Sequence, residues 1–344
     1  MNAHLLSVDT LSRDYVERLF DVAHRMEPIA QRRAITRVLE GAVLGNLFFE
    51  ASTRTRMSFH AAFSRLGGSV CDTTGFTFSS MAKGESLYDT SRVISGYVDA
   101  IVMRHPDAGS VTEFAAATHV PVINGGDGPG EHPSQALLDL YTIRKEFERL
   151  GKAFAGAHLL LTGDLRYGRT VHSLIKLLSL YEPLRLTLVS PPGLEMPAEL
   201  IDHAENAGHR VAQRDSLNAD YGDVDVVYAT RIQKERFTQE MEEGFSLSQD
   251  FSVDRAFLDR HCSPHTVVMH PLPRDSRPGA NDLNVDLNGD PRLAIFRQTD
   301  NGIPVRMAIF ATLMGVDHLF ERDLRRVGWQ PPHQVGVDDA LPTP

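Results

Sequence analysis

Cysteine is scarce in this 344-residue chain, which contains only Cys71 and Cys262. Two thiols so far apart form neither a disulfide framework nor a Cys-x-x-Cys metal motif, and they suit a reducing cytosol. A basic excess is also absent, because 35 lysines and arginines stand against 45 aspartates and glutamates. The formal charge of −10 argues against a generic binder of nucleic acid or of anionic membranes.

Long hydrophobic runs are missing as well. No stretch reaches the roughly 18 apolar residues of a membrane span, and the N-terminal MNAHLLSVDTLSRDY lacks the basic and apolar regions of a signal peptide. Hydrophobic residues make up 42% of the chain and charged residues 23%, which is ordinary globular composition. At about 150 residues per domain the length predicts two domains. We therefore expect a soluble, cytoplasmic, two-domain protein.

Short apolar runs alternate with helical patterns along the chain. Seven runs predict strands that are covered on both faces, over residues 43–49, 100–103, 120–123, 158–161, 185–189, 224–229 and 266–269. A helix is predicted between the first two of them, over 57–66, where Gly67 and Gly68 follow as a C-cap. Repeated alternation of this kind predicts an α/β fold with parallel sheets and right-handed crossovers.

The strand–helix pattern occurs twice, on either side of a long helix predicted near 133–150. An apolar stripe at helical spacing marks this helix: Leu137, Leu140, Ile143, Phe147 and Leu150. It is the natural connector between two doubly wound parallel-sheet domains. A last apolar segment predicts a helix over 303–320, and the proline-rich residues 330–344 predict a loose tail.

The segment Ser52-Thr53-Arg54-Thr55 follows a predicted strand and precedes a predicted helix. The first turn of a helix offers unpaired N–H donors and a partial positive charge, so hydroxyls and an arginine there can complete a phosphate site. An ordinary Ser/Thr helix cap with solvated arginines fits this segment equally well on its own.

A second segment, residues 163–170, reads GDLRYGRT and nearly matches the P-loop of nucleotide triphosphatases. Arg169 stands where that motif needs lysine, and the segment is not the G-x-G-x-x-G of a dinucleotide site either. An arginine at the carboxyl end of a strand suits a bidentate carboxylate clamp better.

Further polar segments follow other predicted strands. They contain Ser79 and Lys83, Arg104, His132 and Gln135, Arg231 and Gln233, and the proline-flanked Leu272 after Pro271. Most lie at the carboxyl ends of strands, where open α/β sheets bind ligands. A cationic cluster in an acidic protein predicts small anionic substrates. No metal site and no cofactor is predicted, because no Cys/His ligand set occurs.

The motifs STRTR, MRHP, HPSQALLDL, GDLRYGRTVHSL, TRIQKER and HPLPR occur in the order seen in the aspartate/ornithine carbamoyltransferase family. The resemblance runs from about residue 4 to about residue 316. TRIQKER and HPLPR are similar to the aspartate-specific members, whereas ornithine-specific members carry an HCLP loop. The resemblance implies transfer of a carbamoyl group from carbamoyl phosphate to L-aspartate, an early step of de novo pyrimidine biosynthesis.

The resemblance also implies roles for single residues. Carbamoyl phosphate would contact Ser52, Thr53, Arg54, Thr55, Ser79, Lys83, Arg104, His132 and Gln135, and the catalytic group would be Arg54, Thr55, Lys83, Arg104 and His132. Aspartate would contact Lys83, Arg169, Arg231, Gln233, Pro271 and Leu272. Ser79 and Lys83 resemble a pair that the family donates to a neighbouring subunit, which implies a homotrimer with shared sites.

For the domains, the resemblance implies a carbamoyl-phosphate-binding domain over 1–135 and an aspartate-binding domain over 150–295. A C-terminal helix at about 303–322 would return to complete the first. Regulatory or other pathway subunits are possible partners. Two alternatives stay open: a carbamoyltransferase for another amino acid, and a non-catalytic scaffold subunit. After Arg274 the chain reads DSRPGANDL, which departs from the family pattern and leaves the geometry of the 274–283 loop open.

Overall fold

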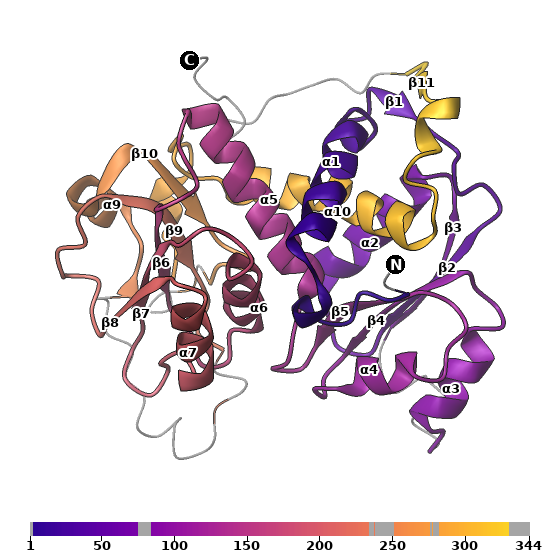
Figure 1. Ribbon diagram of the computed structural model, residues 1–344, viewed down its shortest axis with the longest axis horizontal. Helices are drawn as coiled ribbons and strands as arrows, with labels where there is room; N and C mark the ends of the chain where they lie inside the picture. The colour runs from indigo at the N-terminus through magenta and orange to yellow at the C-terminus, as the bar shows by residue number, and fades with distance from the viewer. Residues whose placement is uncertain are drawn as a thin grey trace. The chain divides into compact units, whose positions relative to one another are not determined.

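The computed structural model describes residues 3–74, 84–233, 237, 251–275, 277 and 282–329, and the following account concerns these (Figure 1). The chain divides into two compact units. Unit 1 contains Met1–Leu138 and Asp300–Pro332, and unit 2 contains Asp139–Thr299. The predicted tail over 330–344 lies outside the described residues.

Unit 1 is built on a four-stranded parallel sheet in the order β3-β2-β4-β5. The strands are β2 (Val43–Phe48), β3 (Ser69–Thr74), β4 (Ala100–His105) and β5 (Val122–Asp127). Its helices are α1 (Arg13–Ala30), α2 (Thr53–Arg65), α3 (Leu87–Ile94) and α4 (Ser110–Ala115). Helices α3 and α4 cover one face of the sheet, and α1 and α2 lie on the other (Figure 1). A short antiparallel pair, β1 (Ala34–Ile35) with β11 (Arg325–Arg326), lies outside this sheet.

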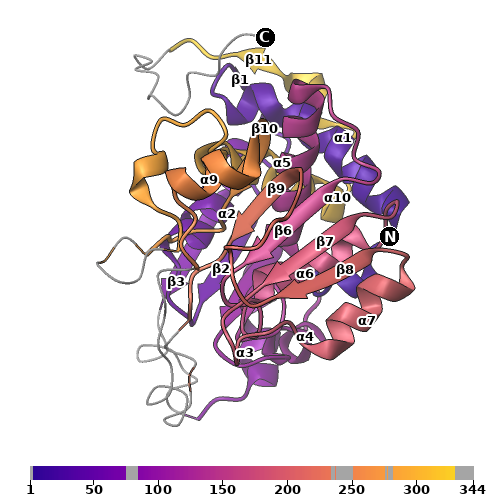
Figure 2. The ribbon, with the colours of Figure 1, turned by 90° about the vertical axis from the view of Figure 1, so that its left-hand side faces the viewer.

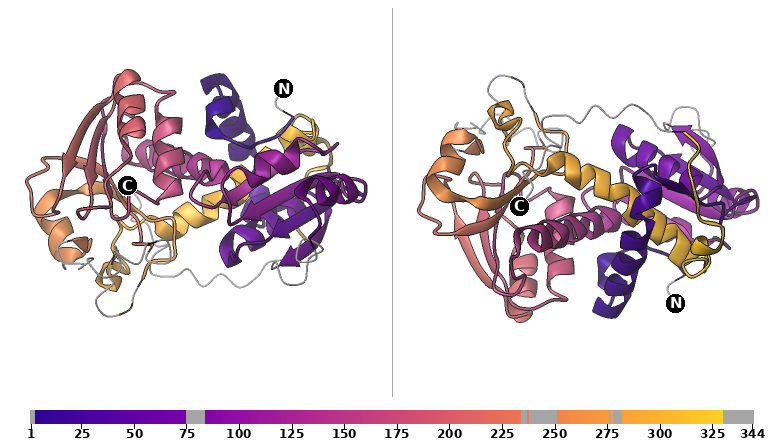
Figure 3. Two further views of the ribbon diagram at one scale, coloured as in Figure 1. Left: turned by 90° about the horizontal axis from the view of Figure 1, so that it is seen from below. Right: turned by 90° about the horizontal axis from the view of Figure 1, so that it is seen from above.

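Unit 2 is built on a five-stranded parallel sheet in the order β10-β9-β6-β7-β8 (Figure 2). The strands are β6 (His158–Thr162), β7 (Arg185–Val189), β8 (Arg210–Arg214), β9 (Val224–Ala229) and β10 (Cys262–Met269). Helices α6 (Arg169–Leu178) and α7 (Ala198–Asn206) lie on one face, and α9 (Arg255–His261) lies on the other (Figure 3). Helices on both faces of a parallel sheet confirm the predicted doubly wound α/β class.

Two helices carry the chain between the units. Helix α5 (Pro133–Leu150) passes from unit 1 to unit 2 after Leu138, and α10 (Ile295–Leu313) passes back after Thr299. The connector helix was therefore predicted with its observed bounds. The final helix begins eight residues before the predicted start at residue 303, because its first turns carry polar side chains that no apolar pattern marks. It ends at Leu313, seven residues before the predicted end at residue 320, and Gly315 follows with a φ of +70°.

The second half of α10 is packed inside unit 1. The Phe310 ring meets Phe63 and Phe59 of α2 edge to face, with ring centroids 4.9 and 5.8 Å apart. All three rings are fully buried, and such pairs add to the free energy gained by burying their area. The C-terminal helix thus returns to the first unit, as expected from the resemblance.

Four strands were not predicted: the two-residue strands β1 and β11, and the strands β3 and β8 of the main sheets. Strand β3 reads SVCDTT and β8 reads RVAQR, and each lies at the edge of its sheet. Edge strands face solvent on one side and tolerate polar residues, so they lack the continuous apolar run of a central strand. The five inner strands β2, β4, β6, β7 and β9 were all predicted. The other two edge strands, β5 and β10, were predicted as well, because their apolar runs are buried.

Candidate active site

Each sheet reverses its strand order at one point. In unit 1 this occurs between β2 and β4, and in unit 2 between β6 and β9. Loops that leave the two strands at such a point diverge, which opens a crevice at the carboxyl edge where doubly wound sheets bind ligands. The predicted segments with Ser52–Thr55 and Arg104 follow β2 and end β4, and those with Arg169 and Arg231 follow β6 and β9, so each unit carries its own candidate binding edge.

Helix α2 begins at Thr53, four residues before the predicted start. Thr53, Arg54 and Thr55 therefore form its first turn rather than a loop ahead of it. Ser52 is the N-cap in extended conformation, and its hydroxyl makes no capping hydrogen bond. No acidic residue occurs in this turn. The turn thus presents hydroxyls, a guanidinium and N–H donors together, which suits an anion.

Arg104 occupies the carboxyl end of β4, opposite Phe48 of β2. Its side chain is only 11% exposed, and Nη2 lies 2.8 Å from Glu50 Oε2. Nη1 donates to the Gly125 carbonyl of β5 at 3.4 Å. A nearly buried guanidinium therefore lies between the segment after β2 and the end of β5, at the reversal point of the sheet.

His132 and Gln135 lie at the start of α5 and are both buried. The Gln135 backbone N–H donates to the His132 carbonyl at 2.9 Å. The preceding turn is held by Asp127, whose Oδ1 accepts from the Glu131 N–H at 2.8 Å and whose Oδ2 accepts from the Gly109 N–H at 2.9 Å. Asp127 thereby fixes the turn that leads into the His132 helix start.

Glycine is required in that turn. Gly128 has a φ of +50°, and a Cβ there would lie 2.2 Å from the Pro106 carbonyl oxygen. Only a residue without a side chain allows the loops after β4 and β5 to approach so closely. The close approach keeps the Arg104 and His132 segments side by side.

In unit 2 the loops after β6 and β9 are tied together by one carboxylate. Asp164 is fully buried; its Oδ1 accepts from the Tyr167 N–H at 2.8 Å and its Oδ2 accepts from the Gln233 N–H at 3.1 Å. The Gln233 side chain donates to the Tyr167 carbonyl at 2.9 Å. The predicted residue Gln233 is therefore fixed against the loop that precedes Arg169.

Arg169 is the first residue of α6 and is 8% exposed, whereas Arg231 is half-buried in the loop after β9. Gly163 explains how these loops meet: its φ is +111°, and a Cβ there would lie 2.1 Å from the Thr230 carbonyl oxygen. The structure thus brings the two segments that carry Arg169, Arg231 and Gln233 to one edge of the sheet.

The third predicted loop of unit 2 follows β10. Leu272 has a φ of +59°, and the bond to Pro273 is cis. The Leu272 N–H donates to His270 Nδ1 at 2.8 Å, and the buried His270 ring also contacts Asp282, with Nε2 2.6 Å from Oδ2. The loop with Pro271 and Leu272 is therefore held from beneath by the His270 imidazole.

Ser79 and Lys83 lie outside the described residues, as do Ser276 and residues 278–281 in the loop after Arg274. Sequence reasoning missed Asp127, Asp164 and Asp282, the buried carboxylates that hold the loops. Asp164 lies three residues after the predicted strand 158–161, and a charged residue so close to the carboxyl end of a buried strand is a signal that sequence reasoning could have used.

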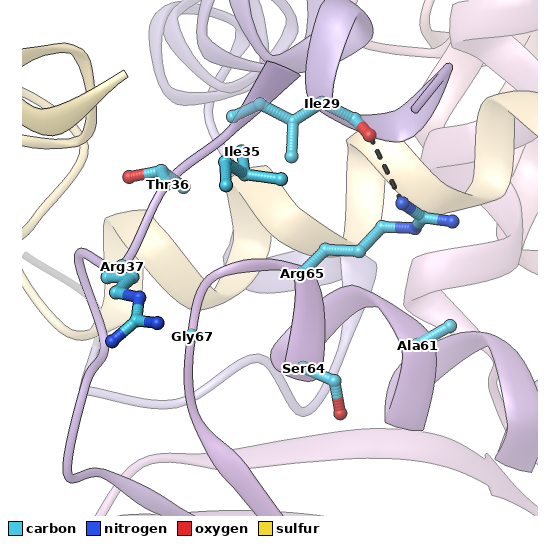
Figure 4. A pocket seen from close by; sticks show the side chains of 8 residues that line it. All are labelled: Ile29, Ile35, Thr36, Arg37, Ala61, Ser64, Arg65 and Gly67. Atoms are coloured by element: carbon cyan, nitrogen blue, oxygen red, sulfur yellow. Dashed lines mark hydrogen bonds between the residues drawn. The ribbon is translucent and has the colours of Figure 1, made fainter. Parts of the chain in front are cut away.

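A separate pocket of about 430 Å³ lies in unit 1 at the far end of α2 (Figure 4). Arg65 donates there to the Ile29 carbonyl at 3.3 Å, and Arg37, Thr36 and Gly67 also line the pocket. No predicted site residue lines it. It lies about 18 Å along the helix from the Thr53 turn, given 1.5 Å per helical residue, so it is distinct from the candidate site.

Within the described part of the chain, no helix is both long and apolar enough to cross a membrane. The same residues contain no group of three or more His, Cys, Asp or Glu side chains arranged to hold a metal ion.

Two family models match the chain. Residues 3–145 match the carbamoyl-P binding domain of aspartate/ornithine carbamoyltransferase, and residues 155–313 match its Asp/Orn binding domain. The chain is 55% identical over 327 residues to the aspartate carbamoyltransferase catalytic subunit of Cellvibrio japonicus, covering 95% of this chain and 96% of that one. It is 56% identical over 341 residues to the Dichelobacter nodosus subunit, covering 99% and 97%.

The structure is similar to a solved one as well. The aspartate transcarbamoylase of Trypanosoma cruzi, in complex with carbamoyl phosphate and aspartate, superposes with a TM-score of 0.80 at 37% identity, covering 89% of this chain and 95% of that one. The chain therefore belongs to the aspartate/ornithine carbamoyltransferase family, among its aspartate carbamoyltransferase catalytic chains, and is a carbamoyltransferase.

Proposed function

We propose that the chain transfers the carbamoyl group of carbamoyl phosphate to the amine of L-aspartate, releasing phosphate, as an early step of cytoplasmic de novo pyrimidine biosynthesis. The observation that carries the proposal is the carboxyl edge of the unit 1 sheet. There the open first turn of α2 lies at the same reversal point as the nearly buried Arg104. The helix turn suits a phosphate group, and Arg104 suits the carbonyl group next to it.

Unit 1 binds carbamoyl phosphate in this proposal. The phosphate lies on the first turn of α2, held by Ser52, Thr53, Arg54 and Thr55. The carbonyl oxygen accepts hydrogen bonds from Thr55, Arg104 and His132, and Gln135 contacts the carbamoyl amide. Losing one donor to an oxygen that gains charge in the transition state commonly costs about 3–4 kcal/mol of barrier.

Unit 2 binds aspartate. Arg169 and Arg231 pair with its two carboxylates, since a guanidinium matches a carboxylate with two parallel hydrogen bonds. Gln233 assists them, and the Pro271–Leu272 backbone directs the amine. The contacts that support this arrangement are those of Asp164, which fixes Gln233 against the Arg169 loop.

Positioning and electrostatics carry the chemistry, because the carbamoyl group is already activated. The amine attacks the carbamoyl carbon, the bond to the phosphate oxygen breaks, and a phosphate oxygen accepts the proton of the amine. The positive charges of Arg54 and Lys83 stabilise the negative charge that develops on the leaving phosphate. No protein carboxylate is needed as base, and no cofactor takes part.

The working unit is a homotrimer in which Ser79 and Lys83 reach a neighbouring chain's site. Two exposed tyrosines on and just after α3 support a subunit contact there: Tyr88 is 60% exposed and Tyr97 74%. Exposed apolar side chains that lie near one another can mark an interaction surface. Regulatory or other pathway subunits would bind such a trimer.

The direct test is turnover of the purified chain with carbamoyl phosphate and a panel of amino acids. We expect carbamoyl-aspartate and phosphate from L-aspartate. Ornithine should give almost no product, because its side-chain ammonium group would face Arg169 and Arg231. Succinate, which has both carboxylates but no amine, should compete with aspartate. Preference for ornithine would contradict the proposal, and so would inactivity with every amino acid.

A further inference from the structure

A chain of hydrogen bonds runs through the core of unit 2, and the proposed mechanism does not use it. Asp139 of α5 is its centre and is fully buried. One carboxylate oxygen accepts from the Tyr228 hydroxyl at 2.6 Å, and the other accepts from the Gln298 side-chain amide at 2.6 Å. Tyr228 and Gln298 are themselves buried, at 0% and 1% exposure.

One arm of this chain ends at the loop after β10. The Gln298 side-chain oxygen accepts from the His270 backbone N–H at 3.0 Å. His270 Nδ1 in turn accepts from the Leu272 N–H at 2.8 Å, so its proton is on Nε2, which donates to Asp282 at 2.6 Å. The loop that carries Pro271 and Leu272 is thus connected to Asp139 through two residues.

The other arm ends at the start of α6. The Thr170 side chain lies next to the Tyr228 hydroxyl and lowers its pKa slightly against the larger opposing effects. Thr170 directly follows Arg169, the proposed carboxylate ligand. Burial and the adjacent Asp139 charge raise the pKa of Tyr228 well above its usual value, so the hydroxyl keeps its proton and donates it to Asp139.

Both helices that connect the units, α5 and α10, contribute a residue to this hydrogen-bond network. Asp139 is the first residue of unit 2 on α5, and Gln298 precedes its last residue, Thr299, on α10. An apolar core would hold the two helices together equally well. A buried polar network in which each donor has an acceptor also fixes one arrangement of its members, because any displacement leaves a buried polar group unpaired.

We propose that Asp139, with Tyr228 and Gln298, positions the aspartate-binding groups by holding the Arg169 helix start and the Pro271–Leu272 loop in a fixed relation. These three are positioning residues that touch no substrate. The inference rests on the proposed function, because it deepens the description of the aspartate site.

The test compares Tyr228→Phe with Tyr221→Phe. The first removes the hydroxyl that donates to Asp139 beside Thr170 and keeps the buried ring. The second is the matched control: Tyr221 is also nearly buried in unit 2, but its hydroxyl donates to the Ser216 carbonyl, apart from the network. Asp139→Asn, which cannot accept both hydrogen bonds in the same way, is the stronger variant.

We expect Tyr228→Phe to raise the KM for aspartate and the inhibition constant of succinate in parallel, by roughly tenfold. The Kd of carbamoyl phosphate, measured by calorimetry, should stay within twofold of the parent. Asp139→Asn should change the same two constants by more, and Tyr221→Phe should leave them unchanged.

Two results would overturn the inference. If Tyr228→Phe lowers the melting temperature like Tyr221→Phe but keeps the parent's KM for aspartate, the network is merely structural. If carbamoyl phosphate affinity falls as much as aspartate affinity, the network does not act on the aspartate site. Should Asp139→Asn fail to fold, Tyr228→Phe decides alone. A parent chain that does not use aspartate overturns both proposals, whereas parent-like variants overturn only this one.

Discussion

The two units build their binding edges in different ways. In unit 1 the proposed phosphate ligands Ser52 through Thr55 are consecutive, and one helix start presents them. In unit 2 the proposed aspartate ligands come from three loops far apart in the chain, which Asp164 and Asp139 hold from within the core. A phosphate accepts several hydrogen bonds at once, and a helix start supplies a cluster of donors locally. An amino acid needs charges at set separations, which only tertiary contacts can fix.

The largest expected effect tests the local character of the unit 1 site. Arg54→Ala should lower turnover by about a thousandfold, because it removes a charge that meets the developing phosphate dianion. The matched control is Arg65→Ala at the other end of the same helix, which should keep turnover within about twofold. Circular dichroism and steady-state rates check both. Near-normal turnover of Arg54→Ala would remove this residue from the mechanism.

A complementation experiment asks whether the unit 1 site is complete within one chain. Lys83→Ala chains and Arg54→Ala chains should each be inactive. If neighbouring chains share each site, every mixed trimer should regain one complete site, which is about a quarter of all sites after random exchange of equal amounts. The measurement is turnover after subunit exchange, which labelled chains verify. Activity that stays at background despite verified exchange would contradict site sharing.

The variant Arg231→Ala should show that the two units bind different substrates. We expect the KM for aspartate to rise by roughly a hundredfold, since a charge-assisted pair to a carboxylate is lost. The Kd of carbamoyl phosphate should remain within a few-fold of the parent, because unit 1 alone would hold that substrate. Calorimetry measures the second quantity directly. A collapse of carbamoyl phosphate affinity would contradict the assignment of Arg231 to aspartate.

Asp164→Asn should have a smaller effect of the same kind. An amide can accept from only one side, so either the Tyr167 N–H or the Gln233 N–H loses its acceptor, and the KM for aspartate should rise by about tenfold. Asp225→Asn is the control: its carboxylate accepts from the His158 N–H at the opposite edge of the same sheet. Equal KM values for the two variants would show that Asp164 has no special role.

The smallest effect on activity is expected at Glu146, which pairs with Arg297 and Arg149 inside unit 2. Burial alone would raise its pKa, but the hydrogen bonds and charges of both arginines outweigh burial and lower the pKa below the usual 4.5. A carboxylate with a lowered folded-state pKa stabilises the fold above its unfolded pKa, and this contribution is lost as pH falls through the folded pKa.

Glu146→Gln should therefore cost about 2 kcal/mol of unfolding free energy at pH 7, with the KM for aspartate unchanged. The difference from the parent should shrink as pH falls below about 4.5, where the parent carboxylate also becomes protonated. Denaturant titrations at several pH values check this. A difference that does not depend on pH would mean that the charge of Glu146 contributes nothing.

The buried strands and helices were predictable because burial requires a pattern of apolar residues that can be seen within a short stretch of sequence. The inner strands are continuous apolar runs, and the connector helix carries Leu137, Leu140, Ile143 and Phe147, all buried, at helical spacing. The edge strands β3 and β8 and the first turns of α10 leave no such trace, since solvent accepts polar side chains there. The start of α2 was placed late because its first turn holds hydroxyls and arginines instead of apolar residues.

The sequence by itself determined the chemistry: which hydroxyls, arginines and histidines stand at the ends of which strands, and hence the family. Only the tertiary structure decided which carboxylates hold those groups in place. Asp164 lies 69 residues from Gln233, and Asp139 lies 159 residues from Gln298. Apolar periodicity is a property of neighbours in the chain, whereas a buried hydrogen bond joins residues that become neighbours only after folding.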